Sequence, residues 1–207
     1  MHPNPLYRTD DRALCEGLIE AIGFGMVFAA TPDGPRVAHT PLLSNGEGAV
    51  QFHLARSNAL ARHLDGETAL IVVNGPDAYV SPRWYDNRDT VPTWNYVTAQ
   101  VRGRLTPIDD GEGQLAVLRR TAAVAEQGAR DPWRLEKAPE GRVDFLLPMI
   151  RSFRIHVEAI EGATKLGQKH PVGDRVRVIC ALTAKGGGTE TDLARLMDVA
   201  RHDADLA

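Results

Sequence analysis

The sequence is poor in cysteine, in basic charge and in long apolar runs, and each shortage argues against a class of protein. Its two cysteines, Cys15 and Cys180, have no CxxC or CxxH neighbour, so buried thiols are expected rather than a disulfide or a metal site. A formal net charge of −3 offers no basic surface for nucleic acid. No apolar run reaches the length of a membrane span, and the N-terminus lacks the pattern of a signal peptide. No membrane partner and a cytoplasmic location are therefore expected.

Aromatic residues are also scarce, at 6% of the chain, but they are concentrated in residues 75–98. This stretch holds Trp84 and Trp94, three of the four tyrosines and three prolines. Rigid turns that carry flat side chains beside amide and hydroxyl groups suit a pocket for a planar polar ligand. The alternative is that these aromatic side chains fill a core.

Alternating apolar residues and turn signals predict a mainly β protein with helices, of the α+β class. Strands are expected at 24–30, 35–43, 49–54, 68–74, 91–105 and 152–160, with a tight turn at 45–48. Helices are expected at 10–22, 59–64, 109–128, 140–147, 174–184 and 190–202, and a polar loop at 161–169. No internal repeat and no low-complexity segment occurs.

The segment before the expected helix at 59–64 has the features of a phosphate site. Ser57 or Asn58 is suited to cap that helix, whose N-terminal amides would favour an anion, and Arg56 would add a charged contact. The alternative is a solvated arginine beside a simple cap.

Several chemistries lack their signatures. GxGxxG after a strand, GxxxxGK[ST], HExxH and GxSxG are all absent, and the seven histidines have no ligand spacing, so no metal site is predicted and no catalytic residue is assigned. His39 and His53 can converge on neighbouring strands as metal or haem ligands, although a hydrogen-bonded strand histidine is the commoner arrangement.

The order of five motifs resembles the PaiB-like group of FMN-binding negative transcriptional regulators. The motifs are HTPL, FHLARSN, GPDAYVSPRWY, VPTWNY and IEGATKLGQ, at residues 39–42, 52–58, 75–85, 91–96 and 160–168. The resemblance implies a six-stranded Greek-key split β-barrel of the FMN-binding type at residues 1–170, with a C-terminal helical extension packed on it at 171–207. It also implies a homodimer with FMN at the interface.

Carried over position by position, the resemblance places one strand along the flavin ring, a phosphate-binding segment after it, and an aromatic motif that approaches the cofactor across the interface. The implied cofactor-binding residues are Ala38, His39, Thr40, Pro41, Arg56, Ser57, Asn58, Trp94, Asn95, Lys165 and Gln168. The sequence departs from the family pattern at Gly167, where the family has serine.

Three functions remain open from the sequence. The first is an FMN-binding transcriptional regulator or flavin sensor; DNA binding here rests on the family label alone, because no helix-turn-helix with a basic helix is visible. The second is an FMN-dependent oxidoreductase that uses NADH or NADPH. The third is a haem-binding or haem-degrading split barrel with His39, His53 or His156 as axial ligand.

Overall fold

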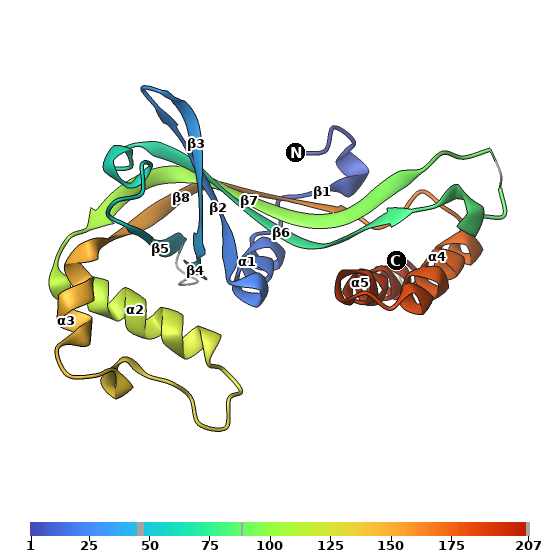
Figure 1. Cartoon of the computed structure of the whole chain (residues 1–207). Coiled ribbons are helices and arrows are strands. Elements are labelled where there is room, and N and C mark those ends of the chain that lie inside the picture. Colours follow the sequence, from blue (N-terminus) through green and yellow to red (C-terminus); the bar gives the residue numbers. More distant parts are fainter. Residues whose placement is uncertain (45–47, 88, 206–207) are drawn as a thin grey trace. The chain divides into compact units, whose positions relative to one another are not determined.

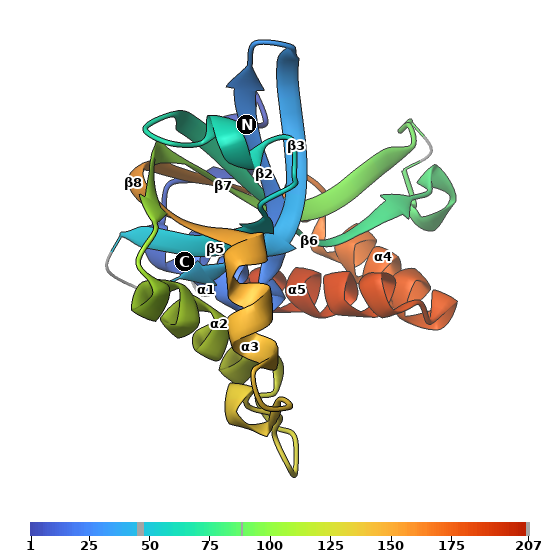
Figure 2. The same ribbon diagram turned by 60° about the vertical axis from the view of Figure 1, so that its left-hand side comes forward.

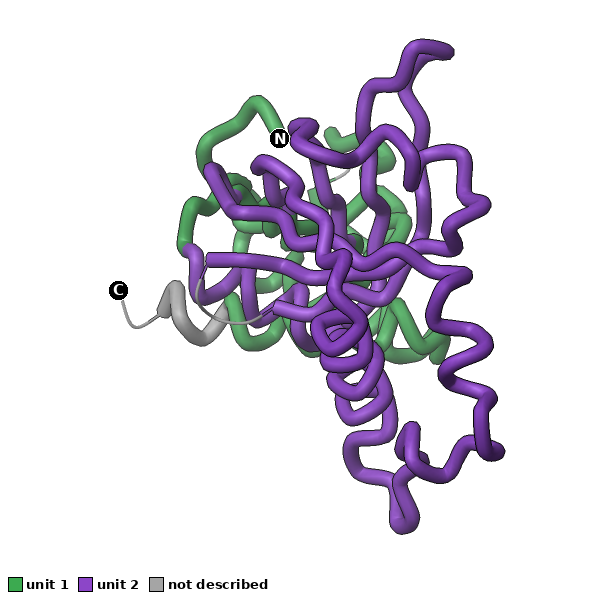
Figure 3. Tube along the Cα trace, turned by 90° about the vertical axis from the view of Figure 1, so that its left-hand side faces the viewer, with its two compact units in different colours: residues 1–11, 74–99, 161–207 green, residues 12–73, 100–160 purple. Residues whose placement is uncertain are grey.

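The computed structural model describes residues 1–44, 48–87 and 89–205, and these form two compact units (Figure 3). Unit 1 comprises residues 1–11, 74–99 and 161–207, and unit 2 comprises residues 12–73 and 100–160. The boundary expected at residue 170 remains a prediction. No helix in the described part of the chain is long and apolar enough to cross a membrane.

The described strands form one sheet in the order β3-β2-β6-β7-β8-β5-β4, and β1 pairs with β8 (Figure 1). Their bounds are β1 Arg8–Thr9, β2 Phe24–Thr31, β3 Gly34–Pro41, β4 Leu43–Ser44, β5 Ala49–Ala55, β6 Thr68–Val80, β7 Thr93–Ile108 and β8 Ile150–Lys165. The six longer strands are the six expected from the sequence, and β1 and β4 add two residues each. The turn expected at 45–48 falls on residues 45–47, outside the described residues.

A hydrogen bond between β3 and β5 closes the longer strands of unit 2 on themselves. β3 ends the path of paired strands, yet Thr40 Oγ1 donates to the carbonyl oxygen of His53 on β5 at 2.6 Å. Thr40 is buried, and the burial of β3 alternates around it. The sheet of unit 2 therefore curves into a barrel.

The barrel of unit 2 encloses an aliphatic and aromatic core. Phe52 and Phe153 are register partners on β5 and β8, and their rings stack with centroids 5.5 Å apart. The largest fully buried side chains of this unit also include Ile71, Leu105, Ile155 and Val27. Burying each such side chain contributes about 1.5–3 kcal/mol, so this core is the main source of the unit's stability.

At Gly103 the backbone of β7 lies close against that of β8. A Cβ atom at this position would collide with the backbone carbonyl of His156. Because only glycine lacks that atom, the residue allows the two strands to pack at this spacing.

Three α-helices belong to unit 2, and all were expected: α1 Arg12–Ile22, α2 Gly111–Ala125 and α3 Arg142–Leu146. α2 begins after Asp110, whose carboxylate accepts from the Gly113 N–H at 2.6 Å. Arg120 fastens α2 to the sheet by donating to Gln51 Oε1 and to the Ser44 carbonyl, both at 2.9 Å. Figure 2 shows α2 and α3 as neighbours.

In unit 1 the continuations of β6, β7 and β8 lie beside the helix pair α4 Val172–Lys185 and α5 Gly188–Asp205 (Figure 1). Gly186, with φ of +74°, ends α4 in the left-handed conformation that glycine adopts without strain. Leu182 of α4 and Leu193 and Met197 of α5 are buried. Cys15 on α1 is buried as expected, whereas the expectation is wrong for Cys180, which is exposed on α4.

Three elements differ from what the sequence predicts. The helix expected at 59–64 is a single 3-10 turn, Ala61–His63, because the chain has only a few residues between Asn58 and the turn at Gly66. The loop expected at 161–169 is strand up to Lys165, since β1 supplies a partner for Gly162 and Ala163. β6 likewise continues past residue 74 to Val80.

Candidate functional site

The strand expected along a flavin ring is β3, an edge strand of the described sheet. Ala38 and Thr40 are buried on its barrel side, His39 is exposed on the other, and Pro41 is half-buried. The His39 ring stacks on that of Phe24, with centroids 6.4 Å apart and planes at 22°. Only one side of the β3 backbone joins the ladder with β2, so peptide groups on the other side can bond to a ligand. The strand therefore offers a ligand backbone groups and one imidazole.

Arg56 follows β5 and is exposed. Its Nε donates to the Pro148 carbonyl at 2.8 Å and its Nη2 to the Ile150 carbonyl at 3.2 Å, while its backbone N–H donates to Met149 at 2.7 Å. The guanidinium is thereby held in one orientation. Its other N–H groups have no acceptor in the described part of the chain, so an anion can bind to them.

Ser57 and Asn58 complete the segment. Asn58 Oδ1 accepts from the Leu60 N–H at 2.9 Å, and Ser57 is exposed. The expected capping role thus belongs to Asn58, but it caps a turn that leads to a 3-10 helix. A 3-10 helix of three residues has little dipole, so an anion here depends on Arg56 and the Ser57 hydroxyl.

The three candidate haem ligands lie on β3, β5 and β8 of unit 2. His53 Nδ1 is buried with no hydrogen-bond partner among the described residues, and burial lowers the pKa of its imidazole. His53 faces Ser152 across the ladder, whereas His156 lies opposite Ala49 and its Nε2 is 3.1 Å from Thr106 Oγ1. The partner of His53, Ser152, lies four residues from His156 on β8, a distance of about 13 Å along the strand, so His53 and His156 do not converge.

The described residues hold no group of three or more His, Cys, Asp or Glu side chains suited to a metal ion.

Trp94 on β7 presents its indole to solvent in unit 1. Its side chain is 50% exposed, its Nε1 donates to Asp77 Oδ1 on β6 at 2.8 Å, and the ring of Tyr79 meets it edge-on at 6.3 Å. Asp77 and Tyr79 therefore fix the indole plane. An exposed but oriented aromatic ring is a surface on which a planar ligand can stack.

Lys165 reaches the same strand from β8. Its Nζ donates to Thr93 Oγ1 and to the Trp94 carbonyl, the latter at 2.9 Å. Partial burial lowers the pKa of this ammonium. Lys165 thus holds the start of β7 in place, and its bond to Trp94 brings two of the predicted cofactor-binding residues into contact.

Asn95 and Gln168 use their amides within unit 1. Asn95 is 1% exposed, and its Nδ2 donates to Met197 Sδ on α5 at 3.6 Å. Gln168 donates to the Thr164 carbonyl and accepts from the Leu166 N–H at 2.8 Å. Gly167, which directly precedes Gln168, has φ of +81°. The serine of the family pattern would be strained in this left-handed backbone conformation. The replacement of the family's serine by Gly167 therefore suits the backbone conformation at this position.

The aromatic stretch at residues 75–98 contains both exposed and buried rings. Trp94 is exposed, whereas Tyr85 belongs to the core, and the sequence alone did not distinguish these two roles. Tyr85 is buried and stacks on His170 with centroids 4.3 Å apart, and burial together with Asp174 raises the pKa of its hydroxyl. Asp174 accepts from the Asp86 N–H at 2.8 Å and from Arg177 at 2.7 Å, and these bonds hold its pKa low. Tyr85 is thus an anchor for α4.

Asp77 is the functional candidate that sequence reasoning missed. It lies in the quoted motif GPDAYVSPRWY, but its role becomes visible only when β6 continues past residue 74 and places it opposite Trp94. A prediction that β6 extends to Val80 would have identified Asp77 as a neighbour of Trp94.

Known proteins resemble this chain in sequence and in fold. Protease synthase and sporulation protein PAI 2 of Bacillus subtilis is 28% identical over 186 residues, which are 87% of this chain and 88% of that protein. Among solved structures, the flavocytochrome Anf3 of Azotobacter vinelandii matches with a TM-score of 0.61 at 14% identity, over 79% of this chain and 72% of that chain. The FAD and heme binding protein of Mycobacterium smegmatis matches with a TM-score of 0.60 at 13% identity, over 87% and 80%.

These structural likenesses confirm the expected fold, a mainly antiparallel split barrel with helices. The family model described as "Putative FMN-binding domain" matches residues 1–159, which include all of unit 2 except its last residue. This match supports FMN as the cofactor, and the PaiB-like resemblance is confirmed by the Bacillus subtilis relative. The chain belongs to this FMN-binding family.

Proposed function

We propose that the protein binds FMN as a homodimer and acts as a PaiB-like flavin-dependent regulator or flavin sensor. The observation that carries the proposal is Arg56, whose guanidinium is oriented by two backbone carbonyls and keeps N–H groups for an anion. A flavin phosphate is such an anion.

The other predicted residues fit the remaining parts of FMN. The free side of the β3 backbone and His39 suit the polar edge of the isoalloxazine, and Trp94 suits its flat face. In the proposed dimer, each copy supplies Trp94 to the flavin held at Arg56 of the other. Asn95 and Gln168 act as positioning residues, because their amides are bonded inside unit 1.

Bound FMN supplies hydride or one-electron chemistry, which the protein orients and shields. The oxidoreductase alternative uses the same site. Steady oxidation of NADH or NADPH with an acceptor would favour the enzyme, and a flavin that turns over slowly with these donors would favour the sensor.

The direct test is the visible absorption spectrum of the purified protein after FMN is added and excess is removed by gel filtration. Flavin bands that elute at the mass of a dimer support the proposal. Elution of a flavin-free monomer would overturn it, and a Soret band on haem titration that is lost in a His53→Ala variant would favour the haem alternative.

Trp94 offers a second test of the dimeric site. We expect Trp94→Ala to weaken FMN binding and dimerisation together, because the indole would contact the cofactor across the interface. An unchanged dissociation constant and an unchanged mass would remove Trp94 from the site. Trp84→Ala, in the loop between β6 and β7, is the matched control.

A further inference from the structure

Arg175 on α4 is a buried cation without a counter-charge. The residue is 9% exposed, and its Nε is enclosed with no hydrogen-bond partner. No ion pair joins its guanidinium to a carboxylate in the described part of the chain. A buried charge without a partner is strongly disfavoured, so this guanidinium requires an acceptor that these residues do not supply.

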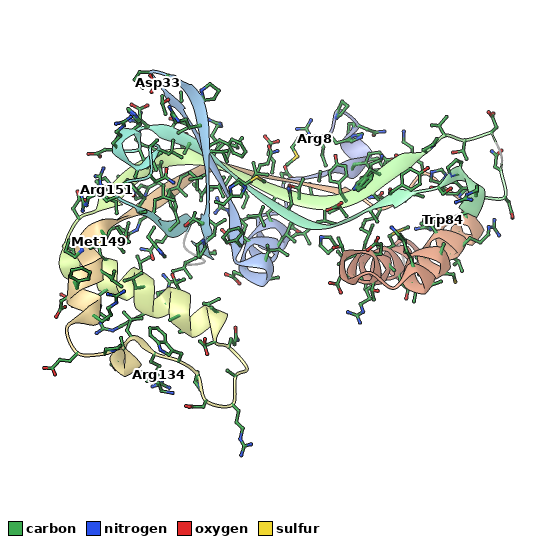
Figure 4. All side chains as sticks on the ribbon, viewed as in Figure 1. Arg8, Asp33, Trp84, Arg134, Met149 and Arg151 are labelled. Atoms are coloured by element: carbon green, nitrogen blue, oxygen red, sulfur yellow. The ribbon has the colours of Figure 1, made fainter. Side chains whose placement is uncertain are left out.

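The packing of unit 1 causes this burial. Arg175 lies on the same buried face of α4 as Val178 and Leu182. α4 packs against α5 and against the 3-10 turn η3 Pro82–Trp84, whose Trp84 is labelled in Figure 4. The guanidinium is therefore held inside the unit rather than on a mobile surface side chain.

The acid next to Arg175 in the sequence does not neutralise it. Asp174 Oδ1 accepts from the Asp86 N–H at 2.8 Å and from Arg177 at 2.7 Å. Two further acids of the helix pair are bonded to other basic side chains, Glu190 to Lys185 and Asp192 to Arg195. The positive charge of Arg175 is thus not balanced by these carboxylates.

Three elements of unit 1 meet Arg175 beside Gly167, the residue that follows the last turn out of β8. A Cβ atom placed on Gly167 would lie 3.7 Å from Asn95 Nδ2 on β7 and 3.7 Å from Met197 Cε on α5. It would lie 4.0 Å from Arg175 Cγ. The stem of the arginine and the amide of Asn95 therefore border the same place.

The amide of Asn95 is a second donor with little to bond. Asn95 is 1% exposed, yet its Nδ2 donates only to Met197 Sδ, at 3.6 Å. A thioether is a weak acceptor, so a stronger one would be favoured here. An oxyanion supplies acceptors for both the guanidinium and the amide. A tetrahedral oxyanion suits donors on two elements better than a planar carboxylate, because its oxygens do not lie in one plane.

This place is separate from the surface proposed for the flavin. Trp94 and Asn95 are neighbours on β7, so their side chains point to opposite faces of the strand. Trp94 is 50% exposed, whereas Asn95 is buried against α5. Arg175 and Asn95 therefore lie on the helix side of β7, behind the exposed indole.

We propose that Arg175 and Asn95 bind a phosphate group on the helix side of unit 1. Since only 9% of Arg175 is exposed, the site admits the phosphate group and excludes a flavin ring. The group is inorganic phosphate or the phosphate of a small monoester. The bound anion connects α4 with β7, and it does not depend on FMN.

Calorimetric titration with inorganic phosphate at constant ionic strength tests the site. The titration uses Arg56→Ala, because Arg56 presents another free guanidinium. We expect saturable binding that weakens about tenfold or more when Arg175→Met is added. No saturable heat, or the same affinity with and without Arg175, would overturn the proposal.

Two comparators identify the chemistry of the ligand. Acetate, which is planar, should bind about tenfold more weakly than phosphate, and equal binding would refute a site for a tetrahedral anion. Glycerol 3-phosphate distinguishes the two sources of the phosphate group. Weaker binding than inorganic phosphate assigns the site to the free ion, and tighter binding assigns it to monoesters.

Melting temperatures provide an independent readout. In phosphate-free buffer Arg175→Met should melt at or above the wild-type temperature, because the variant removes an unpaired buried charge. Phosphate should raise the melting temperature of Arg56→Ala but not that of Arg56→Ala with Arg175→Met. A marked fall in Arg175→Met alone would reveal an internal partner of Arg175 and contradict the proposal.

Arg177→Met is the matched control on the same helix. Arg177 is paired with Asp86 and Asp174, so its loss should lower the melting temperature but leave the response to phosphate intact. Loss of that response in Arg177→Met as well would show that the effect is not specific to Arg175. FMN titration of Arg175→Met should match the wild type, which separates failure of this site from failure of the flavin site.

Discussion

Replacing Arg56 by alanine separates the phosphate from the rest of the flavin. The guanidinium makes two hydrogen bonds inside the protein, to the carbonyls of Pro148 and Ile150 at 2.8 and 3.2 Å. Because the side chain is exposed, their loss should lower the free energy of unfolding by only about 1 kcal/mol. The loss of a charged bond to phosphate is larger, about 1.5–3 kcal/mol, or about 10- to 150-fold in the dissociation constant of FMN.

The assay is titration of FMN and of riboflavin, which lacks the phosphate, followed by flavin fluorescence at fixed salt. Arg56→Ala should weaken FMN and leave riboflavin unchanged. Arg62→Ala, a nearby exposed arginine, should leave both unchanged, and urea unfolding measures the loss of stability. Equal loss of both flavins would refute the phosphate role and show that Arg56 acts only by holding residues 148–150.

Three further perturbations test the fold around the site. Thr40→Val removes the bond to the His53 carbonyl and should lower the free energy of unfolding by about 1–3 kcal/mol in urea titrations, so an unchanged midpoint would contradict closure of the barrel there. Gly103→Ala drives a methyl group into the His156 carbonyl and should cost about 3 kcal/mol or more, seen as a large fall in melting temperature; a wild-type melting curve would disprove the close strand contact. Asp174 has a pKa held below its ordinary 3.8, so its stabilisation is present above that pH and is lost as pH falls through the folded-state pKa. Asp174→Asn should be less stable at neutral pH and lose less stability below about pH 5, and parallel pH profiles for variant and wild type would count against this linkage.

Most strands and helices were predictable because the spacing of their apolar residues and their capping residues is visible within a few positions of the sequence. The strands expected at 24–30 and 49–54 end within one residue of β2 and β5, and α2 lies within the helix expected at 109–128. These features depend on neighbours within a few residues, which the sequence displays directly.

What the sequence could not display depends on partners far along the chain. β8 continues to Lys165 because β1 pairs with it, and β6 continues to Val80 where Trp94 and Asp77 bond across the ladder. The candidate site shows the same dependence on distant partners. Adjacent residues on a strand point to opposite faces, so Trp94 and Asn95 must differ, but only the packing of α5 shows that Asn95 is the buried one, in contact with Met197.

Unit 1 is assembled from both ends of the chain and a middle segment. β1, at residues 8 and 9, finds its partner only at residues 162 and 163, and α4 and α5 come later still. Closing so long a loop costs entropy that only the completed contacts repay. As the chain leaves the ribosome, residues 8 and 9 must therefore wait until residues 162 and 163 have been synthesised. The strands of unit 2 lie between residues 24 and 160 and can pair before α4 and α5 emerge, so barrel formation precedes completion of unit 1 during biosynthesis.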